Sequence, residues 1–194
     1  MNTVLDAVAE RLILSDESQI RIPEICEVTG VNYGSVYHHF GSREGVIEAA
    51  YEKIFSQLVD EDIEALSKVS TTVETFDDFV EAVAPLVELV SSGKKRRSRR
   101  ALRLRIVAAA QTRPALKSAI GDAQVRLTDR LSDVIGYGQE HGWLRSDLSA
   151  HTIAVVMQVL IFGRNLDDVA SAPIDDGDWE VAMGVAFSGM VRSR

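Results

Sequence analysis

The chain has little of several residue types, and each shortage excludes a class of protein. It contains one cysteine, Cys26, among 194 residues, which excludes an internal disulfide framework. Only 6% of the residues are aromatic, and four are proline. Alternating runs of β-branched residues are rare, so a β-sandwich or barrel is not expected. The apolar fraction of 46% is enough to bury a core, which excludes a disordered chain.

Long hydrophobic runs are also missing. The longest covers residues 152–162, includes Gln158, and has about half the length that a membrane-spanning helix needs. The first ten residues lack the basic and then apolar pattern of a secretory signal. Together with the single cysteine, these features predict a cytoplasmic protein with no membrane partner.

The charge is acidic overall and unevenly distributed. The net charge of −8 argues against a nucleic-acid partner when taken alone. Residues 1–50 carry three basic and eight acidic side chains, whereas residues 91–130 carry twelve basic and two acidic ones. The densest part, Lys94–Arg100, is called the basic block below. It is either a solvated loop that balances acidic neighbouring helices or a contact for phosphate.

Apolar residues recur at helical spacing along nearly the whole chain, so the predicted class is all-α, with about nine helices and no strand. Gly30 is typical of the left-handed position that ends a helix, Gly41 is expected to end the next helix, and Asn32 and Ser42 are good N-caps. The helices are expected at residues 3–14, 23–29, 33–39, 42–66, 75–90, 97–111, 114–139, 147 or 149 to 169, and 179–190.

The most informative stretch is residues 20–51, where two short helices joined by a glycine-containing turn predict a helix-turn-helix. Glycine inside a helix costs about 1 kcal/mol relative to alanine, so Gly34 indicates close approach to another molecule such as DNA. The alternative is a helical packing unit without a nucleic-acid partner. The side chains predicted to share the buried face are Ile25, Val28, Val31, Val36 and Phe40. Those predicted to face a DNA groove are Tyr33, Gly34, Ser35, Tyr37 and His38.

This stretch resembles the N-terminal DNA-binding domain of tetracycline-repressor (TetR) family transcription regulators. Residues 31–44 align with that family's pattern without a gap, and residues 140–148 resemble the turn that members often carry before their eighth helix. The matching positions in the first segment are Ile22, Ile25, Gly30, Val31, Gly34, Tyr37, His39, Phe40, Ser42 and Glu44.

The resemblance implies a DNA-binding domain at residues 1–45, with its motif at residues 21–40, and a helical ligand-binding and dimerisation domain at residues 46–194. By position, Arg43 would contact phosphate and Asn32 would serve as a cap, while His39 and Phe40 would belong to the core. The residues implied in DNA binding are Arg21, Asn32, Tyr33, Gly34, Ser35, Tyr37, His38 and Arg43.

Two features depart from the family pattern. Arg21 replaces the threonine that normally caps the second helix, and the first 50 residues are net acidic. Because phosphate neutralisation supplies most non-specific affinity, a single acidic domain should bind DNA weakly. Pairing of two such domains would compensate through bivalency, and the basic block is a candidate for auxiliary phosphate contacts.

The resemblance also implies a homodimer formed by the eighth and ninth helices of two copies. The alternative is that these apolar helices complete the core of their own chain. The residues expected in the interface are Ile153, Met157, Leu160, Ile161, Val181, Val185 and Met190.

A cavity for a largely apolar small-molecule effector is implied among the fourth to eighth helices. Each candidate could equally be ordinary core. The candidate lining residues are Leu58, Phe79, Val83, Leu86, Leu104, Val107, Gln111, Val155, Gln158 and Phe162.

No catalytic constellation, cofactor motif or metal-ligand spacing is found, so neither an enzyme nor a metal or cofactor is expected. The predicted function is a dimeric, sequence-specific DNA-binding transcriptional regulator, a repressor released from operator DNA by a small-molecule effector. The alternative is a helical dimer that binds small molecules or proteins and has little useful DNA affinity.

Overall fold

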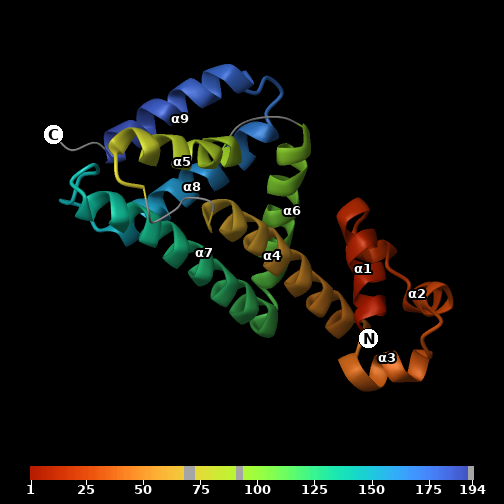
Figure 1. Cartoon of the computed structure of the whole chain (residues 1–194). Coiled ribbons are helices and arrows are strands. Elements are labelled where there is room, and N and C mark those ends of the chain that lie inside the picture. The colour runs from red at the N-terminus through yellow and green to blue at the C-terminus, as the bar shows by residue number, and fades with distance from the viewer. Residues whose placement is uncertain (68–72, 91–93, 192–194) are drawn as a thin grey trace. The chain divides into compact units, whose positions relative to one another are not determined.

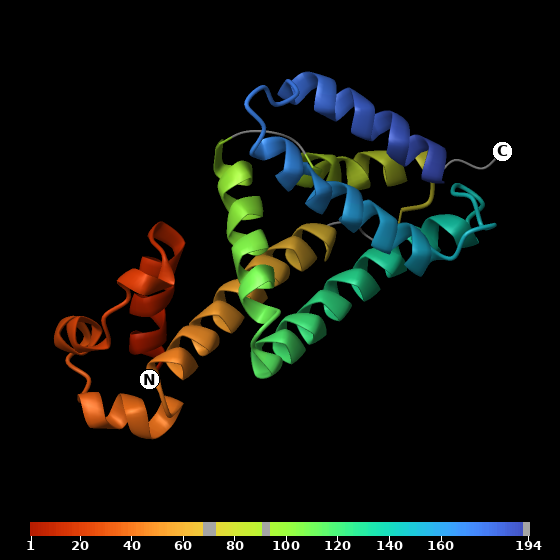
Figure 2. The same cartoon turned by 180° about the vertical axis from the view of Figure 1, so that it is seen from behind.

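The computed structural model describes residues 1–67, 73–90 and 94–191, and over these residues it contains helices and no strand. The predicted all-α class is therefore confirmed (Figures 1 and 2). A 3₁₀ turn, η1, covers Glu17–Gln19. The helices are α1 (Asn2–Leu14), α2 (Ile22–Thr29), α3 (Tyr33–Phe40), α4 (Arg43–Ser67), α5 (Phe76–Val90), α6 (Lys94–Ala110), α7 (Pro114–Glu140), α8 (Ala150–Asp168) and α9 (Asp176–Val191).

The helix ends in the N-terminal part follow the signals in the sequence. Gly30 ends α2 with a left-handed φ of 69°, and Gly41 ends α3 with a φ of 76°. The Asn32 side chain accepts hydrogen bonds from the amides of Gly34 and Ser35. The Ser42 hydroxyl accepts one from the amide of Gly45 at 3.0 Å. Local chemistry thus fixes the short helix α3 at both ends.

The basic block differs from the sequence prediction, because it forms the first turns of a helix instead of a loop. Helix α6 begins at Lys94, three residues before the predicted start. Arginine and lysine are good helix formers, but a run of them carries no apolar periodicity from which a helix can be recognised.

The residues fall into two compact units, with boundaries inside α4, α6 and α7. The first unit contains residues 1–58 and 105–123, and the second contains residues 59–104 and 124–194. Each unit is described here by itself. The division at residue 45 into a DNA-binding and a ligand-binding domain stays a prediction.

The first unit is built on a core that α1, α2, α3 and the start of α4 share. Its fully buried side chains include Val4, Val8, Leu12, Ile20, Ile25, Val36 and Ile47.

Three arginines donate hydrogen bonds to the end of α1 and to the residues between α1 and α2. Arg43 donates to the carbonyls of Glu17 and Ile20, and Arg105 donates to those of Leu12 and Ser15. Arg113 donates to both carboxylate oxygens of Glu17, at 3.0 and 3.1 Å. The turn that leads into α2 is therefore held by α4, α6 and the residue before α7.

In the second unit, α9 runs back beside α8 and also contacts α5 (Figures 1 and 2). Ile153 and Ala154 of α8 and Met183 of α9 are buried in this unit. A polar cluster links α7 to α8, because the Gln158 amide donates to Thr128 Oγ1 at 3.1 Å and accepts from Gln124.

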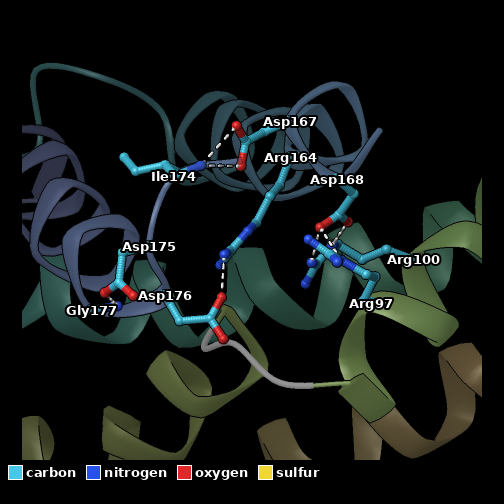
Figure 3. Close-up of polar contacts among 9 residues, drawn as sticks. All are labelled: Arg97, Arg100, Arg164, Asp167, Asp168, Ile174, Asp175, Asp176 and Gly177. Carbon is cyan, nitrogen blue, oxygen red and sulfur yellow. Dashed lines mark hydrogen bonds and ion pairs between the residues drawn. The ribbon is translucent and has the colours of Figure 1, made fainter. Parts of the chain in front are cut away.

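Within the second unit, the first part of α6 is held to α8 and α4 by ion pairs, and Figure 3 shows those to α8. The Asp168 carboxylate accepts two hydrogen bonds from Arg100, both at 2.8 Å, and one from Arg97 at 3.1 Å. Arg99 and Arg103 pair with Asp62 of α4 at 3.1 and 2.5 Å. The side chains of Lys94 and Lys95 lie outside the described residues. Arg97, Arg99 and Arg100 of the basic block are thus paired with carboxylates of their own chain.

Within the described ranges, no helix is both long enough and apolar enough to span a membrane.

Replacing Asp168 with asparagine should destabilise the protein in a pH-dependent way. Burial raises the pKa of Asp168, but the hydrogen bonds from Arg100 and Arg97 outweigh it and hold that pKa below its usual value. The carboxylate therefore contributes stability above its unfolded pKa of about 3.9, and this contribution is lost as the pH falls through the folded pKa. We expect Asp168→Asn to lower the free energy of unfolding by about 1–3 kcal/mol at pH 7.

Urea unfolding of both proteins between pH 7 and pH 3 measures this difference. It should stay constant down to about pH 5 and shrink below about pH 4, where the Asp168 carboxyl becomes protonated in the unfolded chain before it does in the folded protein. A difference that is absent at pH 7, or that does not change down to pH 3, would contradict the role given to the Arg97–Asp168–Arg100 cluster.

Candidate nucleic-acid interface

Helix α3 is buried on one side and exposed on the other. Val36 is 0% exposed, whereas Tyr33 is 48% exposed. Gly34, Ser35 and His38 are also exposed, and Tyr37 is half-buried. Four of the five positions predicted to face away from the core are exposed, and the fifth, Tyr37, is half-buried. The exposed side of α3 carries two phenol rings, a hydroxyl and an imidazole, which are groups that donate hydrogen bonds to phosphates or base edges.

The Asn32 cap supplies a structural reason for glycine at position 34. The Gly34 amide donates to Asn32 Oδ1 at 2.8 Å. A Cβ atom built on Gly34 would lie 3.1 Å from that same oxygen, which is tighter than most such contacts. Glycine therefore leaves room for the cap. This reason is independent of the close approach to DNA that the sequence suggested.

The two tyrosines form a pair on the exposed side. Their ring centroids are 4.6 Å apart. The side-chain hydrogen bond to Tyr33 is the largest cause of the raised pKa of Tyr37, followed by burial. A tyrosine hydroxyl is protonated at neutral pH even without this shift, so Tyr37 can donate to an anionic phosphate oxygen.

Arg21 and Arg43 differ in their availability. Arg21 precedes α2, makes no side-chain cap and is exposed. The Arg43 guanidinium is held by the carbonyls of Glu17 and Ile20 and lies 3.5 Å from Glu44. These two carbonyl contacts orient the turn before α2 and leave the guanidinium fewer donors for phosphate, although its side chain is 31% exposed. The assignment of Arg43 to phosphate binding stays a prediction.

Two core predictions are wrong. Val28 is 73% exposed, and His39 is exposed with its ring edge-on to that of Phe40 at 4.6 Å. Helix α2 has only eight residues and already buries Ile22 and Ile25, so it has no second buried face to offer Val28. Periodicity over so short a helix does not separate a buried apolar residue from an exposed one.

The basic block's contact with DNA stays a prediction, and the side chains of Lys94 and Lys95, which belong to it, lie outside the described residues. Arg97 and Arg100 bind Asp168, and Arg99 binds Glu61 and Asp62. An arginine that already pairs with a carboxylate of its own chain releases fewer counterions on contact with phosphate. The alternative prediction was a solvated loop that balances acidic neighbouring helices. These ion pairs agree with the balancing of charge, but the arginines lie on helix α6 and not on a loop.

The residues predicted for a dimer interface divide by burial. Ile153 is 1% exposed, so its place in an interface is corrected, since it packs inside its own chain. Met157, Leu160 and Ile161 are half-buried, whereas Val181 and Val185 are 70% and 69% exposed. The side chain of Met190 lies outside the described residues.

Sequence reasoning missed the exposed face of α8. Its residues recur at intervals of four and three, which places them on one side of the helix. Because α8 is apolar on two sides, periodicity alone did not identify the side that its own chain covers. The α8 stripe consists of Val155, Val159, Phe162, Leu166 and Val169, all at least 38% exposed.

The candidate pocket residues are not alike in burial. Leu58 and Phe79 are buried, Val83, Val107 and Gln158 are partly buried, and the Leu86 side chain lies outside the described residues. Leu104 and Gln111 are exposed. Val155 and Phe162 belong to the α8 stripe, so their assignment to an internal pocket is corrected. The Gln158 amide already binds Gln124, Thr128 and the carbonyl of Ala154.

Among the described residues, no group of three or more histidine, cysteine, aspartate or glutamate side chains is placed to hold a metal ion.

Comparison with known sequences points to one family of DNA-binding proteins. Residues 18–50 match the family described as bacterial regulatory proteins, tetR family. The HTH-type transcriptional regulator AlkX of Mycobacterium tuberculosis is 30% identical over 59 residues. This alignment covers 30% of the chain and spans only 28% of the relative's length.

Comparison with solved structures extends over the whole chain. A TetR-family transcriptional regulator from Rhodococcus sp. is similar with a TM-score of 0.67 and 20% identity, covering 97% of both chains. A transcriptional regulator from Saccharomonospora viridis, solved in complex with choline, has a TM-score of 0.73 and 17% identity, covering 100% of this chain and 97% of the other. At these identities the similarity establishes the fold.

Replacing Asn32 with alanine should weaken α3 through the loss of its cap. Removing an N-cap side chain of this type costs about 1 kcal/mol, and serine retains most of the capping. We therefore expect Asn32→Ala to lower the free energy of unfolding by about 1 kcal/mol and Asn32→Ser to change it by less than half as much.

Urea unfolding of the three proteins measures these values. A matched change at the exposed residue Gln57 of α4, Gln57→Ala, removes a side-chain amide without removing a cap and should leave stability nearly unchanged. Equal stabilities for Asn32→Ala and wild type would show that the Asn32 hydrogen bonds do not support α3.

Proposed function

We propose that this chain is a TetR-family transcriptional regulator rather than an enzyme, and that it acts as a dimeric repressor that small molecules release from operator DNA. In this proposal the exposed side of α3 binds the major groove. The protein acts in the cytoplasm, where its operator DNA lies.

The observation that carries the DNA-binding part is the geometry of α3. One side is fixed to the core by Val36, and the first turn is fixed by the Asn32 cap. The opposite side presents Tyr33, Ser35 and His38 to the outside. A short helix with polar groups on its free side and a rigid attachment behind it has the shape and chemistry for reading bases in a groove. We assign Tyr37 and Arg21 to phosphate contacts, which fix register.

Dimerisation is supported by the apolar surface that the single chain exposes on its last two helices. The α8 stripe extends from Val155 to Val169, and α9 exposes Val181 and Val185. Monomeric proteins rarely leave so continuous an apolar surface in water. A second copy of the chain is the proposed occupant, because a two-fold operator requires two reading helices about one duplex turn apart.

Effector release is proposed to act by population shift. A small molecule bound by helices of the second unit would favour a conformation in which the two α3 helices no longer match the operator spacing. The buried or partly buried candidates Phe79 and Val83 would give such a site an apolar lining. The choline of the Saccharomonospora viridis protein illustrates a small ligand on this fold and does not identify the effector of this chain.

A second candidate function is a helical dimer with little useful DNA affinity. The observation that favours it is charge. Residues 1–50 carry a net charge of −5, and the Arg43 guanidinium is occupied by its own chain. A DNA-binding surface with so few available cations depends on hydrogen bonds and on pairing of two domains for its affinity.

Selection of binding sites from random duplex DNA with the purified full chain separates the two candidates. Enrichment of a two-fold-symmetric sequence is expected if the protein is an operator-binding regulator. Because few cations contact phosphate, the affinity for that sequence should fall with salt less steeply than for regulators that make six to ten phosphate contacts. Failure to enrich any sequence at low salt would favour the second candidate and contradict the first.

Introducing a charge into the α8 stripe should dissociate the dimer. Val159 is 63% exposed in the single chain, so glutamate is tolerated there in the monomer but would be buried without a partner in the dimer. We expect Val159→Glu to be folded and monomeric at micromolar concentration, with operator affinity reduced by more than tenfold because bivalency is lost.

The matched control is Val125→Glu, at a valine of α7 that is 57% exposed and lies outside the proposed interface. Sedimentation velocity should find this variant dimeric, like the wild type. A wild type that sediments as a monomer, or a dimeric Val159→Glu variant, would refute the proposed interface.

A further inference from the structure

Arg164 of α8 is the most deeply buried charged side chain that the structure describes, and it contacts the first turn of α9. It is 2% exposed, and its Nη2 donates to Asp176 Oδ1 at 2.5 Å (Figure 3). Its guanidinium carbon lies 4.7 Å from the centroid of the Trp179 ring. Asp176 and Trp179 are three residues apart, so they lie on one face of α9. Arg164 thus binds that face at two points.

Helix α9 needs such a contact, because its apolar residues do not favour one orientation. They surround the helix instead of forming one stripe, so hydrophobic burial alone leaves its rotation about its own axis poorly determined. Met183 is buried, while Val181 and Val185 are exposed. A rotation of α9 would exchange these apolar residues at little cost in buried area. A polar contact with a defined geometry would select one rotation of α9 about its axis.

The turn that precedes α9 is held by the same end of α8. Both carboxylate oxygens of Asp167 accept a hydrogen bond from the amide of Ile174, at 3.2 Å (Figure 3). The Asp175 carboxylate accepts one from the amide of Gly177 at 2.8 Å. These contacts fix where α9 begins, but they bind backbone amides and do not contact the side chains of α9. Arg145 donates to the carbonyl of Gly189 near the other end of α9 at 3.1 Å, so in the first turn Arg164 is the contact that bears on the rotation of the helix.

Burial of a charged side chain is a poor source of stability, since desolvation offsets most of the attraction to its partner. Where such a group is retained, its best-attested role is to select one arrangement of helices. The stacking of Arg164 on Trp179 adds a directional contact that an aliphatic side chain would not supply. These points favour a role in geometry over a role in stability.

We propose that Arg164 is a positioning residue that sets the rotation of α9 on α8, through Asp176 and Trp179, and thereby selects the apolar face that α9 offers to a second copy of the chain. This inference rests on the proposed dimer. It goes beyond it in assigning interface geometry to a residue that is itself buried inside the protomer.

The test compares dimer dissociation with stability in three full-length variants. Arg164→Met keeps the length and apolar stem of the side chain and removes both contacts. Trp179→Leu removes the stacking alone. The control, Asp168→Asn, breaks an ion pair one turn further along α8 that is directed at α6 instead of α9. Sedimentation equilibrium gives the dimer dissociation constant, and thermal unfolding gives the stability of each variant.

We expect Arg164→Met to weaken the dimer by at least tenfold and Trp179→Leu by a smaller factor. Asp168→Asn should lower stability but leave the dimer dissociation constant within about twofold of wild type. Arg164→Lys keeps the charge and should recover part of the lost affinity, because lysine still reaches a carboxylate but stacks less well.

Two results would overturn the inference. One is a dimer of wild-type affinity in both Arg164→Met and Trp179→Leu. The other is equal weakening by these variants and Asp168→Asn, which would indicate a general loss of order in the second unit. Since Trp179→Leu retains the ion pair, it keeps the test informative if Arg164→Met does not fold. A monomeric wild type would instead contradict the dimer itself, and that failure is recognisable before any variant is made.

Discussion

The exposed side of α3, which is the proposed DNA-binding surface, depends on one constraint, the burial of Val36 in the core of the first unit. Helix α3 has eight residues, and Val36 is its fully buried side chain. So short a helix is not stable alone in water, so it exists because Val36 packs on the core and Asn32 satisfies its first amides. Once those two points are fixed, the direction of Tyr33, Ser35 and His38 follows from helical geometry. Recognition chemistry is thus held in place by residues that do not take part in it.

Several arginines bind carbonyl or carboxylate groups of their own chain. Arg43, Arg105 and Arg113 bind the residues between α1 and α2, while Arg97, Arg99 and Arg100 hold α6 to α8 and α4. A chain with a net charge of −8 therefore presents fewer cations than its composition suggests. Arginines of this chain order turns and helices, and under the proposed function the affinity for DNA would depend on hydrogen bonds, shape and the pairing of two copies.

The sequence predicted the features that depend on neighbouring residues, such as helix ends. It did not predict the contacts and the burial that depend on residues far away in the chain. The caps at Asn32 and Ser42 and the glycine stops at Gly30 and Gly41 are local chemistry, and all were predicted correctly. The partners of Arg43 and Arg97 lie 23 and 71 residues away, so no local pattern indicates that these arginines are occupied. Helix α8 is apolar on two sides, so its sequence did not reveal that Ile153 faces inward and Val159 outward. A buried arginine such as Arg164 is recognisable only when its partners on α9 are known.

The most direct test of the central claim is to change the exposed side of α3 without changing its support. Tyr33→Ala and Ser35→Ala are made together, with Asn32 and Val36 retained, and DNA sites are selected with this variant and with wild type. The account predicts a folded double variant that enriches a different or less defined sequence than wild type does, because the groups that read bases have been removed. Enrichment of the same sequence by both proteins would contradict the claim that this side of α3 reads DNA.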